Sequence, residues 1–355
     1  MVVSIPRGLG SGADALNASP TVAADPHHPA LLVLLADGEL HSGQWLAEKL
    51  GLSRAAVWKG IERLRVLGID VEALPRRGYR LSAPVELLAG AAIRAALRSP
   101  QSAHLRSLEL LFEVDSTNTR LLGAPAPPDG CADVLISEVQ HAGRGRRGRP
   151  WIAPFGGSIA LSMGWTFADA SRASPALSLC VGVAVARALA RAGARGIGLK
   201  WPNDIWFDDR KVGGVLLELR AEASGPAHVV IGIGLNLSLS AAVRAQIEAT
   251  GVRVASVADA CGATPSRNFV AGAIIDELLS MLSAFEQHGF AAFRDAWEAL
   301  DALRDRRAQV LVGKDAVSGT ARGVDHHGAL RLERAGRVQE FVSGEVSLRL
   351  GGDDI

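Results

Sequence analysis

The segment from Gly143 to Trp151 concentrates the residue types best suited to binding an anion. Its sequence, GRGRRGRPW, sets four arginines among three glycines and ends in a proline and a tryptophan. An arginine keeps its charge near neutral pH, and its planar guanidinium matches phosphate and carboxylate oxygens. Glycine amides can donate to the same anion, and an indole offers a flat face for a purine. We therefore interpret the segment as a nucleotide-phosphate clamp.

Two other interpretations of this segment are open. Gly143, Gly145 and Gly148 satisfy the dinucleotide-binding pattern G-x-G-x-x-G. That pattern needs a helix to begin at its last glycine, and Arg149 precedes a proline, which disfavours the helical conformation. A solvated basic loop that meets nucleic acid nonspecifically is the second alternative. The chain carries 38 Lys plus Arg against 37 Asp plus Glu, so the basic charge is concentrated locally, which favours the clamp.

Four further motifs combine polar side chains with glycine or proline. One follows a predicted strand, one interrupts a strand with a proline, and two place glycines where a ligand can approach the backbone closely. Each is weak alone, since such sequences also form ordinary turns and bulges. Together, in this order, they are specific. They are Asp115-Ser116-Thr117-Asn118, Lys200-Trp201-Pro202-Asn203-Asp204, Lys211-Val212-Gly213-Gly214 and Gly232-Ile233-Gly234-Leu235-Asn236.

Length and composition indicate a soluble cytoplasmic protein of two or three domains. The 355 residues contain no uninterrupted apolar stretch of membrane-spanning length and no secretory signal at the N-terminus. Cys131, Cys180 and Cys261 form no C-x-x-C pair, and the histidines show no H-E-x-x-H spacing, so we expect reduced thiols and no structural metal. Residues 1–25 are rich in Ala, Gly, Ser and Pro, which predicts a disordered tail.

Residues 26–88 are predicted to form a winged helix-turn-helix that binds DNA. Short helices are expected at Leu31–Leu35 and after His41, and Ser53 is placed to cap a third helix. Two short strands, Val71–Leu74 and Tyr79–Leu81, flank a basic turn. A helical module that packs on a protein partner is the alternative, and Gly60 within the third helix costs about 1 kcal/mol relative to alanine. The predicted DNA contacts are Ser53, Arg54, Lys59, Arg63, Arg76 and Arg77.

The remaining chain is predicted to form two further domains. In residues 89–303 the predicted strands and helices are grouped more than they strictly alternate. Such grouping favours an α+β fold whose helices lie on one side of a mixed sheet. The expected strands are 108–114, 134–137, 159–165, 212–219 and 229–235, and the expected helices are 89–97, 177–192, 269–287 and 290–300. Residues 304–355 contain five short strands at 309–312, 317–321, 330–332, 338–342 and 346–350, which suggest a small β-barrel.

In this order, the arginine segment and the four motifs strongly resemble the biotin protein ligases, or biotin–[acetyl-CoA-carboxylase] ligases. The whole layout resembles their bifunctional bacterial class, in which a winged-helix repressor domain precedes the catalytic domain and an SH3-like domain follows it. The resemblance extends from about residue 30 to about residue 350.

The resemblance implies a two-step reaction. The carboxylate of biotin attacks the α-phosphate of Mg-ATP, which gives biotinyl-5′-AMP and pyrophosphate. A lysine of the biotin carboxyl carrier protein then takes the acyl group and releases AMP. A carboxylate is already ionised at pH 7, so the first step needs charge neutralisation and alignment more than a general base. The resemblance also implies that the adenylate acts as corepressor, promoting a homodimer that binds operator DNA.

The resemblance assigns roles to individual residues. Ser116, Thr117, Asn118 and Gln140 surround the ureido ring of biotin. Arg144, Gly145 and Arg146 cover the carboxylate and phosphate, and Lys211 lies at their junction. Trp151 stacks on adenine, with Asn203 and Asn236 as polar contacts near the nucleotide. Arg149 lies in the same loop, where ordering of the loop or a dimer contact is its alternative role. Asp204 assists deprotonation of the incoming lysine, or pairs with Lys200 or an arginine; Lys211, Arg146 and Asp204 are the catalytic candidates.

Three alternatives to a ligase and repressor follow from the same residues. Gly60 keeps open a ligase whose N-terminal domain no longer regulates. A regulator that responds to a small molecule without catalysis is the second alternative. Lipoate attachment is the third, because lipoate ligases share the catalytic fold, although the arginine segment favours biotin.

Overall fold

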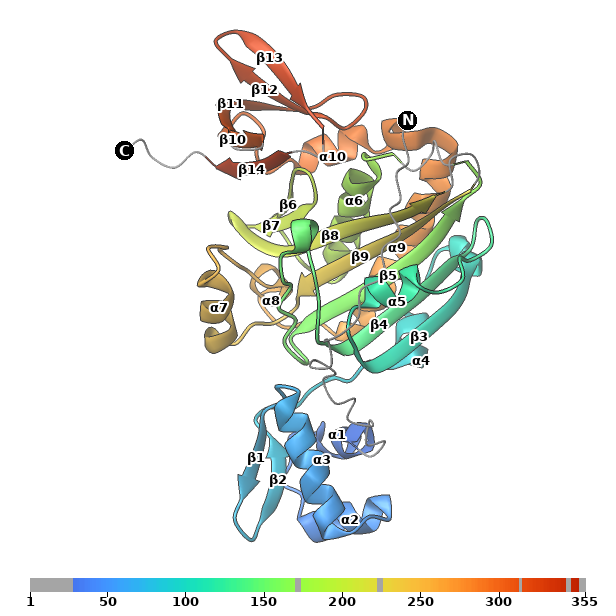
Figure 1. The fold of residues 1–355 in the computed structure, drawn as a ribbon, viewed down its shortest axis with the longest axis vertical. Helices are drawn as coiled ribbons and strands as arrows, with labels where there is room; N and C mark the ends of the chain where they lie inside the picture. The colour runs from blue at the N-terminus through green and yellow to red at the C-terminus, as the bar shows by residue number, and fades with distance from the viewer. Residues whose placement is uncertain (1–27, 170–173, 222–225, 313–314, 343–345, 351–355) are drawn as a thin grey trace, which may run out of the picture.

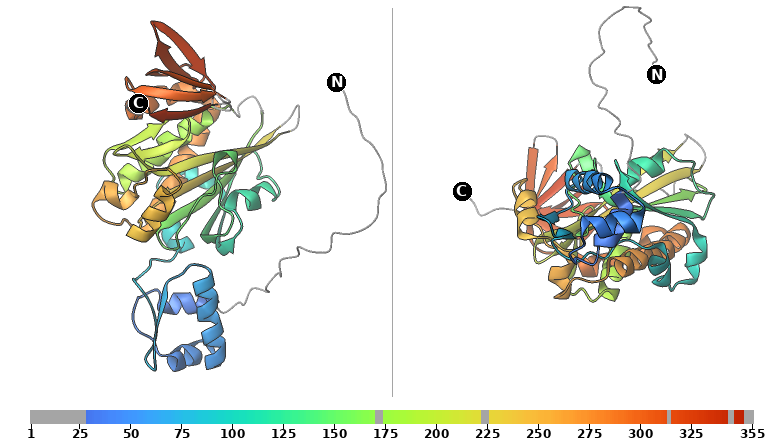
Figure 2. Two further views of the ribbon diagram at one scale, coloured as in Figure 1. Left: turned by 60° about the vertical axis from the view of Figure 1, so that its left-hand side comes forward. Right: turned by 90° about the horizontal axis from the view of Figure 1, so that it is seen from below.

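The computed structural model describes residues 28–169, 174–221, 226–312, 315–342 and 346–350. A small helical domain and a small β-sheet lie at opposite ends of a larger central domain (Figure 1). Figure 2 shows the helical domain beyond one end of the central sheet from a second direction. The predicted tail, residues 1–25, lies outside the described residues.

The N-terminal domain has the predicted winged helix-turn-helix arrangement. Ser42 and Ser53 cap α2 and α3, each accepting a backbone N–H at 3.1 Å. Gly60 has a packing role, because a Cβ there would lie 2.3 Å from Leu31 Cδ1. The close approach of α1 to α3 therefore offsets the helical cost of this glycine. The elements are α1 (His28–Leu35), α2 (Gly43–Leu50), α3 (Arg54–Val66), β1 (Val71–Leu74) and β2 (Gly78–Leu81).

Glu113 joins the N-terminal domain to the central domain. Its carboxylate lies 2.8 Å from Arg63 Nη2 and 3.5 Å from His28 Nε2, both in the N-terminal domain. It also lies 2.9 Å from His141 Nε2, just before the arginine segment. Arg63, predicted to bind DNA, thus donates from Nη2 to a carboxylate of the central domain. The other predicted DNA contacts, Ser53, Arg54, Lys59, Arg76 and Arg77, are exposed.

The central domain is built on a seven-stranded mixed sheet. Its strand order is β3-β4-β5-β9-β8-β7-β6, with β3 and β4 parallel and the other neighbours antiparallel. The sequence predicted five of these strands and missed the short hairpin of β6 and β7. The strands are β3 (Leu105–Val114), β4 (Ala132–Gln140), β5 (Ser158–Phe167), β6 (Ile197–Lys200), β7 (Asp204–Phe207), β8 (Arg210–Ala221) and β9 (Ala227–Asn236).

Helices cover both faces of this sheet, which corrects the prediction that they lie on one side. The long helices α6 (Leu177–Arg191) and α9 (Arg267–His288) pack together and form the main core with one face. On the other face, Leu121 of α5 (Thr117–Leu122) packs on Leu135 and Val230. The remaining helices are α4 (Gly90–Ala95), α7 (Ala241–Glu248), α8 (Val257–Cys261) and α10 (Arg294–Leu300), with 3₁₀ turns η1 (Pro100–His104), η2 (Arg146–Gly148) and η4 (Gly289–Ala292).

One helical segment of the central domain is long and largely apolar, although Asp276 and Glu277 interrupt its apolar residues. Arg267–Ala292 is the one helix in the described part of the chain that is long and apolar enough to cross a membrane. In the structure, 72% of its most apolar window is buried inside the protein. Its apolar side chains thus form the core against α6.

The C-terminal domain is a five-stranded antiparallel sheet of order β13-β12-β11-β10-β14. All five predicted strands are present. They are β10 (Arg307–Val312), β11 (Asp315–Val324), β12 (Leu330–Arg334), β13 (Arg337–Phe341) and β14 (Val346–Leu350). Trp201 anchors this domain on the central domain, because its Nε1 donates to Gly328 O at 3.0 Å.

Asp301, between α10 and β10, predicts a pH-dependent stability. Burial raises the pKa of this carboxyl to about 6, although a hydrogen bond from Leu303 N opposes the shift. The carboxyl of Asp301 therefore holds its proton more tightly in the folded state than in the unfolded state. The free energy of unfolding falls as the pH rises through about 6 and this carboxyl ionises in the folded protein. We expect Asp301→Asn to raise the free energy of unfolding by about 1–2 kcal/mol more at pH 8 than at pH 4.5.

Urea unfolding at both pH values measures this difference. Asp129→Asn, at an exposed position of the same domain, is the matched control and should show no such dependence. An equal effect of Asp301→Asn at the two pH values contradicts the assignment.

Candidate active site

Small residues on the α5 face of the sheet form the floor of the candidate site. A Cβ at Gly232 would lie 2.3 Å from Asn118 Oδ1, and a Cβ at Gly234 would lie 2.5 Å from Trp151 Cε2. The two glycines of β9 alternate with core residues, so they share one face. Their neighbours across the sheet are also small: Ser162 lies beside Gly232, and Gly214 lies beside Gly234. This floor lets an amide and an indole lie directly on the backbone.

The start of α5 supplies a buried polar pocket. Ser116 caps the helix, and Thr117 and Asn118 are each only 4% exposed. Gln140 Oε1 accepts from Thr117 N at 2.9 Å and from Thr117 Oγ1 at 3.1 Å. Ser162, which the sequence did not single out, lies 2.7 Å from Thr117 Oγ1 and 2.5 Å from Asn118 Oδ1. The pocket thus brings together the four residues predicted to surround the biotin ring.

The arginine segment folds as a tight loop over the sheet. Gly145 N donates to Arg149 O at 2.7 Å, and Trp151 N donates to Gly143 O at 2.8 Å. Arg147 and Gly148 take left-handed conformations, with φ of 58° and 70°, and turn the chain between these bonds. These backbone bonds and the turn between them hold the loop in a compact form.

Two arginines of the loop reach partners on the sheet. Arg144 Nη2 donates to Glu218 Oε1 at 2.9 Å, and Arg146 Nη1 lies 3.4 Å from Asn203 Oδ1. Burial is the largest cause that lowers the pKa of Arg146, and the neighbouring Arg147 lowers it further. A guanidinium stays charged at neutral pH even so. A partly buried cation beside a second cation favours an anionic ligand.

Lys211 and Asp204 form a further ion pair close to Trp151 at the end of this loop. Lys211 Nζ lies 2.6 Å from Asp204 Oδ1, so the structure gives Asp204 a partner other than the Lys200 or arginine that the sequence suggested. The same ammonium is 5.9 Å from the centre of the Trp151 ring. Gly214 leaves room for it, since a Cβ there would lie 3.3 Å from Nζ. Lys200 instead lies 4.5 Å from the ring of Trp206, and Trp201 and Trp206 are both buried in the core.

The two asparagines predicted near the nucleotide also hold the backbone. Asn203 Nδ2 donates to Val215 O at 2.7 Å, and Asn236 Nδ2 donates to Ala255 O at 3.2 Å. Asn236 Oδ1 and Trp151 Nε1 are both buried and without a hydrogen-bond partner within the described ranges. A buried polar atom without a partner costs free energy, so these two atoms have capacity for a ligand.

The structure therefore gathers most of the predicted site residues at one place on the sheet. Arg149 is the exception, because it contributes its carbonyl to the loop while its side chain is exposed. Glu218 was missed, although a carboxylate within the apolar run of β8 is a signal that was available. The gathered residues are Ser116, Thr117, Asn118, Gln140, Arg144, Gly145, Arg146, Trp151, Asn203, Asp204, Lys211 and Asn236.

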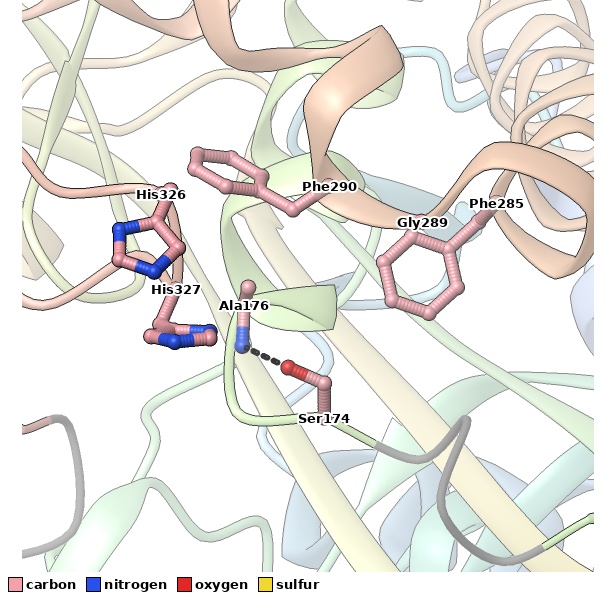
Figure 3. A pocket seen from close by; sticks show the side chains of 7 residues that line it. All are labelled: Ser174, Ala176, Phe285, Gly289, Phe290, His326 and His327. Atoms are coloured by element: carbon pink, nitrogen blue, oxygen red, sulfur yellow. Dashed lines mark hydrogen bonds between the residues drawn. The ribbon is translucent and has the colours of Figure 1, made fainter.

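A separate pocket lies at the seam with the C-terminal domain. Figure 3 shows Phe285, Phe290, His326 and His327 around it, with Ser174 Oγ accepting from Ala176 N at 3.2 Å. The two imidazoles are tilted by 43° to each other, with ring centres 3.8 Å apart. None of its lining residues belongs to the candidate site.

Comparison with protein families gives three matches along the chain. A biotin/lipoate A/B protein ligase family model matches residues 113–236. A helix-turn-helix domain matches residues 30–80, and a biotin protein ligase C-terminal domain matches residues 306–349. The matched regions correspond to the three domains of the structure.

Individual relatives match nearly the whole chain. The bifunctional ligase/repressor BirA of Salmonella typhimurium is 39% identical over 90% of this chain and 96% of its own length. The Bacillus subtilis protein of the same name is 31% identical over 88% and 95%. Among solved structures, the Aquifex aeolicus biotin protein ligase in complex with biotin and ATP matches with a TM-score of 0.58 and 26% identity, covering 69% of this chain and all of that one. The chain belongs to the biotin protein ligase family, in its class of bifunctional ligase/repressors.

Proposed function

We propose that this ligase activates biotin with ATP at the site on the α5 face and transfers it to a lysine of the biotin carboxyl carrier protein. The observation that carries the assignment is the set of groups gathered on and beside the floor of the site. A buried polar pocket lies over Gly232, an indole lies over Gly234, and Lys211 with Arg146 lies beside them. This set matches a ligand that carries a polar ring, an anionic group and an aromatic ring.

The pocket over Gly232 fits the ureido ring of biotin. A ureido group has two N–H donors and one carbonyl acceptor, and Thr117, Asn118 and Gln140 carry both kinds of group in buried positions. Because these side chains already hydrogen-bond to each other and to Ser162, they are oriented before a ligand arrives. Such preorganisation lowers the entropic cost of binding.

The indole over Gly234 and its neighbours fit ATP. Trp151 offers a face for adenine, and Trp151 Nε1 and Asn236 Oδ1 offer an unused donor and an unused acceptor. Arg146 and Lys211 supply positive charge for the phosphates. The described residues contain no group of three or more His, Cys, Asp or Glu placed to hold a metal ion. We therefore propose that Mg²⁺ is bound chiefly by the phosphates of ATP.

The residues act by neutralising and aligning charge. Lys211 and Arg146 bring the carboxylate of biotin to the α-phosphorus, a new P–O bond forms, and pyrophosphate leaves. In the second step the lysine amine of the carrier protein attacks the acyl carbon and AMP leaves. Asp204, held by Lys211, is placed to accept a proton from the incoming ammonium.

Incubation with biotin, Mg-ATP and a carrier-domain fragment tests the proposal. Mass spectrometry should show the carrier gaining one biotinyl group only when ATP is present. An equal excess of lipoate should not compete. No gain in mass, or a gain of lipoyl groups, contradicts the proposed substrate.

We also propose that the adenylate acts as corepressor and promotes a homodimer that binds operator DNA. In support, the capped α3 and the basic tip of the β1–β2 wing expose cations on the surface of the N-terminal domain. β3 is an edge strand of the central sheet and offers backbone groups for pairing with a second copy. The three cysteines are free thiols, which supports a cytoplasmic location.

The wing provides a prediction for DNA binding. The double variant Arg76→Ala/Arg77→Ala removes two exposed cations, and we expect operator affinity to fall about tenfold or more at physiological salt. The slope of log K against log salt should become smaller by about 1.8, since each lost phosphate contact contributes about 0.9. Fluorescence anisotropy at several salt concentrations measures both quantities.

Arg195→Ala, an exposed arginine of the central domain, is the matched control for charge. The double variant should biotinylate the carrier as the wild type does. An unchanged salt slope contradicts a role for the wing in DNA binding.

A further inference from the structure

Glu218 of β8 uses both oxygens of its carboxylate to join two separate parts of the site. Oε1 accepts from Arg144 Nη2 at 2.9 Å, and Oε2 accepts from Asn118 Nδ2 at 2.8 Å. Arg144 lies in the arginine loop, and Asn118 lies in the buried pocket at the start of α5. One side chain of the sheet therefore connects the loop that covers the site with the pocket beneath it.

The contact with Asn118 fixes the orientation of that amide. Asn118 Oδ1 accepts from Ser162, so its Nδ2 faces Glu218 and its oxygen faces β5. The amide lies directly on Gly232, where a Cβ would collide with it. Glu218, together with Ser162 and the more distant Leu216 O at 3.4 Å, thus orients the polar groups that Asn118 presents within the pocket.

The contact with Arg144 holds the loop down. The loop carries four arginines close together. Without the carboxylate of Glu218, their mutual repulsion favours an open arrangement of the loop. The side chains of Arg144 and Glu218 are 40% and 23% exposed, so the ion pair is partly screened by water and of moderate strength. A moderate contact suits a loop that must open for substrates and close over an intermediate.

We propose that Glu218 is a positioning residue that keeps the arginine loop closed over biotinyl-5′-AMP until the carrier protein arrives. This inference rests on the proposed function. An acyl-adenylate is a mixed anhydride, and any accessible lysine amine can attack its acyl carbon and displace AMP. Closure of the loop by Glu218 therefore confines that reaction to the carrier protein by slowing the escape of the intermediate.

Retention of the adenylate tests the proposal in Glu218→Gln, Arg144→Gln and the double variant. We expect biotinyl-5′-AMP to leave Glu218→Gln about tenfold faster than wild type, a change of about 1.4 kcal/mol. The KM for biotin should rise, while kcat for transfer to the carrier stays within about twofold. Serum albumin added as a bystander should become biotinylated by the variant. The double variant should lose less than the product of the two single effects, because both changes remove the contact between Arg144 and Glu218.

Limited trypsin digestion without ligands gives an independent measurement, since trypsin cleaves after exposed arginines. Glu218→Gln should be cut between residues 144 and 149 about tenfold faster than wild type, which corresponds to about 1.4 kcal/mol. Glu340→Gln, the same change on the exposed face of β13, is the control. The thermal midpoint should be equal in all of them, which separates loop opening from a loss of fold.

Each failure has a distinct meaning. An active wild type whose Glu218→Gln variant retains the adenylate equally, or resists trypsin equally, overturns the role of Glu218. Multiplying effects in the double variant overturn it as well, because they show that the two side chains act separately. A wild type that forms no adenylate contradicts the proposed function itself, and an unchanged rate of trypsin cleavage remains the separate refutation of the loop contact.

Discussion

Replacing Lys211 with alanine is expected to lower the rate of adenylate formation by about 10²- to 10³-fold, as removal of a charge-stabilising donor does elsewhere. The change has two consequences. It removes the ammonium beside the proposed site of adenylyl transfer, and it leaves Asp204 without the partner that lies 2.6 Å away. The unpaired carboxylate then repels the phosphates of ATP. Both effects act on the transition state more than on the ring of biotin, so kcat should fall further than the affinity for biotin.

Pyrophosphate release under saturating ATP measures the rate, and calorimetry of biotin binding without ATP measures the affinity. Lys49→Ala, in the last turn of α2, removes a lysine outside the central domain and should leave the rate unchanged. A rate for Lys211→Ala within about fivefold of wild type is incompatible with the proposed site, since one lost donor costs at least about 100-fold.

Gly232→Ala is expected to weaken biotin binding by about 30- to 100-fold, or about 2–3 kcal/mol. The new methyl group would lie 2.3 Å from Asn118 Oδ1 and 2.8 Å from Asn118 Cγ, so the amide must leave its place. Asn118 then loses its contacts with Ser162 and Glu218. Gly232 is not among the glycines with positive φ, so the backbone itself accepts alanine. A loss of biotin affinity in this variant therefore reflects a changed pocket and not a strained strand.

Calorimetry of biotin binding in the absence of ATP measures this effect. Gly90→Ala in α4 is the matched control, because its methyl group would lie at an ordinary distance of 3.8 Å from Leu110 Cδ1. Unaltered biotin affinity in Gly232→Ala would place the biotin ring elsewhere, whereas a large loss of thermal stability would show that the change disturbs the sheet instead.

The long elements follow from local patterns in the sequence. The helices α6 and α9 and the five longer strands of the central sheet carry runs of apolar residues that predict both their type and their place. The caps Ser42 and Ser53, the wing and the five C-terminal strands are likewise local, because hydroxyl caps, glycine turns and alternation act within a few residues. The short elements β6, β7, α5, α7 and α8 escaped prediction, since pieces of four to eight residues owe their structure to neighbours distant in the chain.

Individual glycines show the same limit. Gly60 is a defect when judged by helix propensity, yet the approach of Leu31 from α1 requires it. From the sequence, Gly232 and Gly234 indicated only that another group approaches the backbone of the strand closely. The structure identifies these groups as the amide of Asn118 at Gly232 and the indole of Trp151 at Gly234.

The types of residue and their order along the chain establish the chemistry of this protein. They show which side chains are charged, which are aromatic and where glycines allow tight turns, in the order typical of a biotin ligase. Their assembly was decided by the tertiary structure. It paired Asp204 with Lys211, placed Arg63, a predicted DNA contact, beside Glu113, and set Glu218 between Arg144 and Asn118. Charge and shape belong to a residue wherever it stands, whereas a contact between side chains up to 100 positions apart exists only once the sheet has brought their strands together.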